Sequence, residues 1–179
     1  MKFFTLIVLC LAFSIAACTS DSKTGGKNIE KTVLQPFTDT VKVDTFKIVL
    51  RGEKAKEMNL LFTITAYNGK QIYTKEIKAA DLLKSYLASA DLKSEDEKIK
   101  FLNDEVNFFL DEEHFLVPAI TEQEKPDENT PDLTFYNELK QSQLNGFGYR
   151  LGKDTKLYIA WSAKDQKVKT YYQCCKTPI

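Results

Sequence analysis

Alternating apolar and polar positions predict β-strands in the first part of the chain. Residues 41–50 alternate, and residues 58–67 and 71–77 are rich in apolar and β-branched side chains. Asn68-Gly69 separates the last two runs, and this dipeptide is a strong signal for a hairpin turn in which both residues have positive φ. We therefore predict three strands, of which the second and third form a hairpin.

The apolar period then changes to that of α-helices. Residues 79–90 carry apolar side chains at helical spacing, and Ser94 and Glu97 form a capping box at the start of the next helix. Behind the box, residues 99–110 contain an apolar stripe that we expect to pack in the core. Residues 115–117 predict a short extended segment, because a proline follows them.

An acidic loop and a third helix follow. Residues 121–130 are acidic and have no apolar period, and loops of this length are often functional or disordered. Thr130 as N-cap and Pro131 as the first helical residue predict a helix that ends near Asn145 and Gly146.

The last third has the pattern of a three-stranded meander. Residues 147–151, 157–162 and 168–175 alternate, and short turns separate them. Strands and helices that come in blocks favour an α+β fold over a parallel sheet. We predict an α+β fold: an antiparallel sheet from the N-terminal hairpin region and the C-terminal meander, with two to three helices between them.

Aromatic side chains of this meander are candidates for a binding surface. On an open sheet face, tyrosine and tryptophan can stack on sugars or anchor a partner protein. Alternation groups Trp161 with the core and places Tyr158 on the other face, together with one of the adjacent pair Tyr171 and Tyr172. Tyr149, Tyr158 and Tyr171 are therefore the predicted binding surface for a protein or glycan partner.

The charge balance argues against nucleic acid as a partner. The chain has 25 basic and 25 acidic side chains, whereas nucleic-acid binders usually have a basic excess. No glycine loop, metal-ligand spacing or nucleophile motif is present in the sequence. We therefore predict no cofactor, no metal and no catalytic residues.

The adjacent cysteines near the C-terminus are an unusual feature. Cys174 and Cys175 could form a strained, labile disulfide, because neighbouring Cα atoms are closer than a relaxed disulfide requires. They could also bind a soft metal as a pair. The alternatives are a buried thiol beside an exposed one, or an intermolecular bridge.

His114, the single histidine, follows three acidic residues at positions 111–113. A metal or acid/base site is conceivable there, but residues adjacent in sequence rarely converge on one ion. We interpret this segment as a solvated turn at a helix end. A small hydrolase or redox protein that uses His114 or the cysteine pair is an alternative function.

The N-terminus carries an export signal. Lys2 precedes an apolar run, residues 3–17, that is too short to span a bilayer. The run ends in Ile15-Ala16-Ala17-Cys18, and this segment resembles the lipobox of a bacterial lipoprotein signal peptide. The resemblance implies cleavage before Cys18, acylation of that cysteine, for example with palmitate, and anchoring in the cell envelope as an outer-membrane lipoprotein.

These features define the predicted organisation of the chain. We predict a signal peptide over residues 1–17, a flexible tether over 18–40 and a single globular domain over 41–179. Ser20-Asp21 resembles the acidic export tag of surface lipoproteins in Bacteroidetes, so the domain could face the periplasm or the cell surface.

Function is predicted only in general terms. We expect a lipid-anchored, non-enzymatic binding or accessory module. The segment 148–162 is similar to the Tyr…Trp segment of lysozyme-inhibitor lipoproteins, although it lacks the cysteine bridge expected there. An envelope enzyme inhibitor is therefore the alternative that this resemblance implies.

Overall fold

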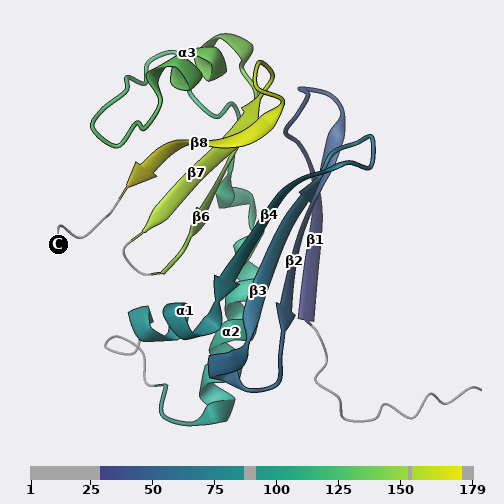
Figure 1. Cartoon of the computed structure of the whole chain (residues 1–179), viewed down its shortest axis with the longest axis vertical. Coiled ribbons are helices and arrows are strands. Elements are labelled where there is room, and N and C mark those ends of the chain that lie inside the picture. The colour runs from purple at the N-terminus through teal and green to yellow at the C-terminus, as the bar shows by residue number, and fades with distance from the viewer. Residues whose placement is uncertain (1–28, 87–91, 153–154, 175–179) are drawn as a thin grey trace, which may run out of the picture.

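The fold is α+β, with two four-stranded antiparallel sheets and three α-helices (Figure 1). The computed structural model describes residues 29–86, 92–152 and 155–174. The predicted fold class is confirmed. The strands divide into an N-terminal and a C-terminal sheet, a detail that alternation along a chain does not show.

The N-terminal sheet is a meander in strand order. Its strands are β1 (Ile29–Pro36), β2 (Val43–Arg51), β3 (Asn59–Thr65) and β4 (Gln71–Lys78). The C-terminal sheet has the same regular order. Its strands are β5 (Phe115–Leu116), β6 (Gly146–Arg150), β7 (Lys156–Ser162) and β8 (Lys167–Cys174).

Helices connect and cover the sheets. The α-helices are α1 (Ala79–Tyr86), α2 (Glu95–Phe109) and α3 (Leu133–Ser142), and the 3₁₀ turns are η1 (Ala55–Glu57) and η2 (Glu112–His114). In Figure 1, α1 and α2 follow the N-terminal sheet, and α3 lies at the far end of the C-terminal sheet.

Strand β1 corrects the predicted domain boundary. Residues 29–36 pair with β2 along their whole length, so the prediction of a flexible tether up to residue 40 is wrong from Ile29 onward. Lys31 occupies one of the inward positions of this edge strand and forms a salt bridge with Asp111. This inward lysine interrupts the apolar alternation that would have revealed the strand. Residues 18–28 lie outside the described part of the chain.

The predicted hairpin is confirmed, but its turn differs. β3 and β4 pair around Asn68 and Gly69. The Gly69 N–H donates to the Ala66 carbonyl at 2.8 Å, and the Ala66 N–H donates to the Lys70 carbonyl at 2.8 Å. Of the two turn residues only Gly69 has positive φ, at 84°. This geometry is that of a longer loop built on a type I turn, in which a glycine in the left-handed region restores the strand register.

The starts of two helices show which sequence signals correctly predict where a helix begins. The capping box of Ser94 and Glu97 is present, and α2 begins directly after it. The third helix begins later than predicted, because Asp132 is its N-cap and Thr130 is not. The Asp132 carboxylate accepts the Phe135 N–H at 3.0 Å, and a carboxylate stabilises the N-terminal end of a helix.

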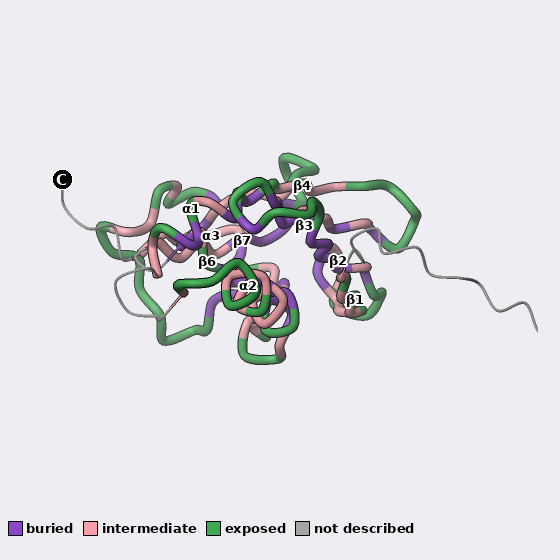
Figure 2. The backbone as a smooth tube through the Cα atoms, turned by 90° about the horizontal axis from the view of Figure 1, so that it is seen from below, coloured by how far each residue is buried: buried purple, intermediate pink, exposed green. Residues whose placement is uncertain are grey.

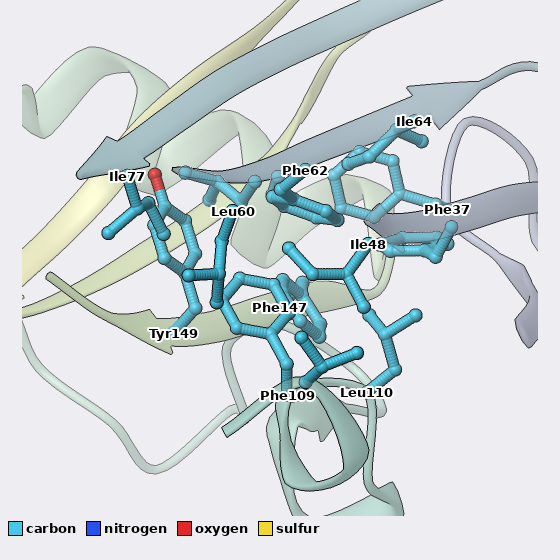
Figure 3. Close-up of a cluster of buried hydrophobic side chains, with 14 of the residues drawn as sticks. Phe37, Ile48, Leu60, Phe62, Ile64, Ile77, Phe109, Leu110, Phe147 and Tyr149 are labelled. Carbon is cyan, nitrogen blue, oxygen red and sulfur yellow. The ribbon is translucent and has the colours of Figure 1, made fainter. Parts of the chain in front are cut away.

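The core lies between the two sheets and α2. Figure 3 shows Phe109 of α2 and Phe147 of β6 below Phe62 of β3, and Figure 2 shows that buried residues gather between these elements. The Phe62 ring lies 5.0 Å from that of Phe109 and 5.2 Å from that of Phe147. One cluster of buried side chains includes residues of both sheets and of all three helices. Both halves of the chain therefore depend on the same core.

A buried carboxylate fixes the tips of the N-terminal sheet. Asp44 is fully buried and accepts the backbone N–H groups of Phe37, Thr38 and Tyr67 at 3.1, 2.6 and 2.8 Å. The Thr38 hydroxyl donates to it as well, at 3.0 Å. These bonds join the β1–β2 connection to the β3–β4 turn. They offset the cost of removing a carboxylate from water.

Candidate ligand pocket

A pocket lies between the C-terminal sheet, the acidic loop and α3. Its volume is about 300 Å³, and four tyrosines form much of its wall. We call it the tyrosine pocket, and it is lined by Leu116, Ala119, Ile120, Glu124, Lys125, Asp127, Tyr136, Tyr158, Tyr171 and Tyr172.

An irregularity in β8 brings two adjacent tyrosines to the same pocket. In the β7–β8 register Tyr158 pairs with Tyr172 and Ile159 pairs with Thr170, so Tyr171 has no partner position. An extra residue of this kind is a β-bulge, which redirects a side chain. Both Tyr171 and Tyr172 therefore line the pocket, where strict alternation would place one of them on the other face. Their ring centroids lie 6.2 and 5.5 Å from that of Tyr158.

Two glycines of β6 make room for these rings. A Cβ atom on Gly148 would lie 3.0 Å from the Tyr158 ring, and one on Gly146 would lie 2.7 Å from the Tyr171 hydroxyl. Neither glycine has positive φ, so close approach of the aromatic side chains is the reason for both. A strand in which glycine alternates with aromatic residues was the sequence signal for this packing.

The acidic loop is held against β8 by hydrogen bonds. The Tyr172 hydroxyl donates to the Asp127 carboxylate at 3.0 Å, and the Gln173 N–H donates to the Asn129 carbonyl at 3.0 Å. From α3, the Lys140 ammonium donates to the Glu124 carbonyl at 2.8 Å. The loop that the sequence marked as functional or disordered is thus an ordered wall of the pocket.

Carboxylates give the pocket a negative electrostatic environment. Burial raises the pKa of the Tyr136 hydroxyl, and the charges of Glu124 and Asp127 raise it further. Burial also raises the pKa of Tyr171, and Glu124 adds to that shift. The backbone N–H of Asn129 lowers the pKa of Asp127, which keeps this carboxyl ionised. Lys125 is the one basic side chain that lines the pocket in the described part of the chain.

The predicted tyrosine surface is partly wrong. Tyr149 is 1% exposed, because its ring packs against Phe62 and its hydroxyl lies 2.6 Å from that of Tyr73. Tyr171 is 4% exposed, and its hydroxyl donates to the Ala119 carbonyl at 3.0 Å. Tyr158 is half-buried. Tyr158 and Tyr171 therefore line a pocket instead of an open face, and Tyr149 belongs to the core.

The sequence pattern does not connect the acidic loop with the tyrosines, and it does not mark Tyr136 as a site residue. Tyr136 lies on the buried face of α3, and a tyrosine at helical spacing among apolar residues is typical of core packing. The contact between α3, the loop and β8 joins segments that are far apart in sequence. Local patterns do not show such a contact.

The remaining candidates are only partly described. Cys174 is the half-buried last residue of β8, whereas Cys175 lies outside the described residues, so a redox or metal-binding pair stays a prediction. Cys18 also lies outside the described residues, and its acylation likewise stays a prediction. His114 is half-buried in η2, and its Nδ1 lies 2.9 Å from the Phe109 carbonyl oxygen. Among the described residues no three His, Cys, Asp or Glu side chains are grouped closely enough to hold a metal ion.

The segment that resembles lysozyme inhibitors forms the β6–β7 hairpin. Tyr149 and Trp161, the aromatic residues of the resemblance, are both buried in it. Comparison with protein-family models, curated proteins and solved structures finds no match. No helix in the described ranges is long and apolar enough to cross a bilayer.

Proposed function

We propose that this protein is a lipid-anchored binding module of the bacterial cell envelope, and that its tyrosine pocket takes a basic side chain of a partner protein. The observation that carries this proposal is the combination of four tyrosines with the carboxylates of Glu124 and Asp127 around one cavity. The proposed anchor is Cys18 of the lipobox, and the N-terminal signal sequence supports a location outside the cytoplasm.

The chemistry of the wall favours a cation. Aromatic rings attract ammonium and guanidinium groups through the negative face of the ring. The chain itself provides an example, because the Lys156 ammonium lies 4.9 Å from the centroid of the Tyr158 ring. The carboxylates of Glu124 and Asp127 add a net negative charge that Lys125 only partly offsets.

The size of the cavity favours a single side chain. Sites for drug-sized ligands range from about 300 to 1,000 Å³, and this pocket lies at the lower limit of that range. A lysine or arginine side chain from a partner fits such a volume and presents its charge to the two carboxylates. A free sugar would instead require an open aromatic face, and the buried Tyr171 does not provide one.

Binding of matched probes tests the pocket. Nα-acetyl-lysine amide and Nα-acetyl-norleucine amide have similar shapes, but only the first carries a cation. We expect the full-length chain in detergent to bind the lysine probe about tenfold more tightly in calorimetric titrations, which matches a partly desolvated cation–π contact of about 1–2 kcal/mol.

Variants test whether the lysine probe binds in the tyrosine pocket. Tyr158→Leu removes a ring from the pocket wall, whereas Tyr67→Leu removes an exposed ring at the β3–β4 turn and is the matched control. Only the first should abolish the preference for the lysine probe. Equal binding of both probes would contradict the cation proposal, and oligosaccharide binding that depends on Tyr158 would favour a glycan instead.

Labelling of cells tests the anchor. A palmitate analogue should label the wild-type protein and leave the Cys18→Ser variant unlabelled. External protease then distinguishes the two orientations, since it removes the labelled band only when the domain faces the cell surface. An unlabelled wild-type band would refute the lipid anchor without affecting the pocket.

A further inference from the structure

A second cleft lies between β6, β7, α2 and η2. Its volume is about 420 Å³, and it is separate from the tyrosine pocket in all its lining residues. Its lining includes Glu105, Phe108, Glu113, His114, Arg150 and Lys156.

Two cations of this cleft face each other across a hairpin. Arg150 and Lys156 are directly paired in the β6–β7 register. Like charges at opposed positions destabilise a sheet. Within residues 29–86, 92–152 and 155–174, neither side chain forms a salt bridge with a carboxylate. The Lys156 ammonium lies 4.9 Å from the centroid of the Tyr158 ring. Burial raises the pKa of Glu105, whereas the charge of Arg150 lowers it. An anion between the two cations would relieve the repulsion that remains between them.

Two acids, Glu105 and Glu113, also line the cleft, and among the described residues neither forms a salt bridge with Arg150 or Lys156. Burial raises the pKa of Glu105, and the charge of Arg150 offsets part of this shift. The Glu113 carboxylate lies 3.7 Å from the His114 imidazole and points largely into solvent. An anion can therefore bind between Arg150 and Lys156 without displacing a carboxylate from a salt bridge with either group.

An apolar side chain completes the cleft. Phe108 of α2 is 62% exposed, although its neighbours Phe109 and Val106 are buried in the core. An exposed phenylalanine beside two cations provides a contact for the apolar part of a ligand. The guanidinium of Arg150 matches the planar, two-oxygen geometry of a carboxylate.

We propose that this cleft binds a small carboxylate ligand with an aromatic or apolar body. The carboxylate lies between Arg150 and Lys156, and the body packs on Phe108. This proposal goes beyond the proposed function: the cleft shares no lining residue with the tyrosine pocket, although the Lys156 ammonium lies over the Tyr158 ring of that pocket.

A charged probe and its neutral counterpart test the proposal. N-acetyl-phenylalanine carries the carboxylate, and N-acetyl-phenylalanine amide has the same body without the charge. Titration into the full-length chain in detergent should show at least tenfold tighter binding of the acid. Equal affinity for the two probes, or no binding of the acid at millimolar concentration, would overturn the proposal.

Variants identify the anion-binding groups. Arg150→Met and Lys156→Met should each weaken binding of the acid about tenfold or more, because each removes a charge-assisted hydrogen bond. Arg51→Met is the matched control, since Arg51 is an exposed cation at the end of β2 and lies outside the cleft. Unchanged affinity in both cleft variants would contradict the assignment. Thermal unfolding of each variant confirms that it is folded.

Discussion

The two sheets have the same number of strands, but their strands differ in how far they are exposed to solvent. β3 of the N-terminal sheet alternates between buried and half-buried residues, as expected of a sheet with one face on the core. In β6 of the C-terminal sheet, four consecutive residues from Gly146 to Tyr149 are buried, and only Arg150 is exposed. β6 is therefore covered on both faces.

The two sheets therefore have different roles in the molecule. The N-terminal sheet contributes one face to the core, whereas the C-terminal sheet shares that core on one side and builds the wall of the tyrosine pocket on the other. The second task requires departures from regular geometry: a bulge at Tyr171 and glycines in β6. Irregular features in the C-terminal sheet thus mark the candidate site.

Loss of a central core ring should have the largest effect. Phe62 is fully buried and its ring contacts aromatic rings of β4, α2 and β6. Phe62→Ala should lower the free energy of unfolding in urea by about 3–5 kcal/mol. Thr63→Ala, on the opposite face of the same strand, should cost less than about 1 kcal/mol. Two separate unfolding transitions in the wild type would contradict a core shared by both sheets.

Removal of the buried carboxylate should rank second. Asp44→Ala would leave the N–H groups of Phe37, Thr38 and Tyr67 without their acceptor. We expect a loss of about 2–3 kcal/mol in the free energy of unfolding, because buried donors without partners are costly. Asp39→Ala alters the more exposed end of the same connection and should have a smaller effect. Equal losses in the two variants would show that Asp44 is not the central contact.

The sequence predicted those elements that depend on neighbouring residues. The capping box of Ser94 and Glu97 spans three positions, and the hairpin at Gly69 depends on one turn, so both are visible in local sequence. Strand β1 was missed because the partner of its inward Lys31 is Asp111, eighty positions away. Local pattern carries no information about such a pair.

The candidate site was predicted less well for the same reason. The exposed surface predicted for Tyr149, Tyr158 and Tyr171 assumed regular alternation and an uncovered sheet. The bulge in β8 and the position of the acidic loop over it depend on tertiary contacts. The residue types were informative about chemistry, but their arrangement depended on the fold.

Substitution of a β6 glycine tests whether its close contact with Tyr171 shapes the tyrosine pocket. Gly146→Ala would bring a methyl group against the Tyr171 hydroxyl and Ala119, and overpacking of this kind costs about 1–3 kcal/mol. The same variant should weaken binding of the lysine probe, because Tyr171 must move. Gly69→Ala in the N-terminal sheet meets no atom within 4 Å and is strained only by its φ of 84°, so it should cost about 1 kcal/mol and leave binding unchanged. Equal loss of probe binding in both variants would contradict a local role for Gly146.

A change in pH should have the smallest effect and concerns the cleft beside the C-terminal sheet. Burial raises the pKa of Glu105 above its ordinary value of 4.5, so the folded chain keeps this proton to a higher pH than the unfolded chain does. The folded state then binds more protons than the unfolded state, and its stability must fall as pH rises from about 4.5 through the raised pKa. Glu105→Gln, which cannot ionise, should remove this part of the pH dependence. Urea unfolding of both proteins at several pH values between 4 and 8 measures the difference. If the two proteins lose stability in parallel over this range, Glu105 is not a proton-binding group of the folded state.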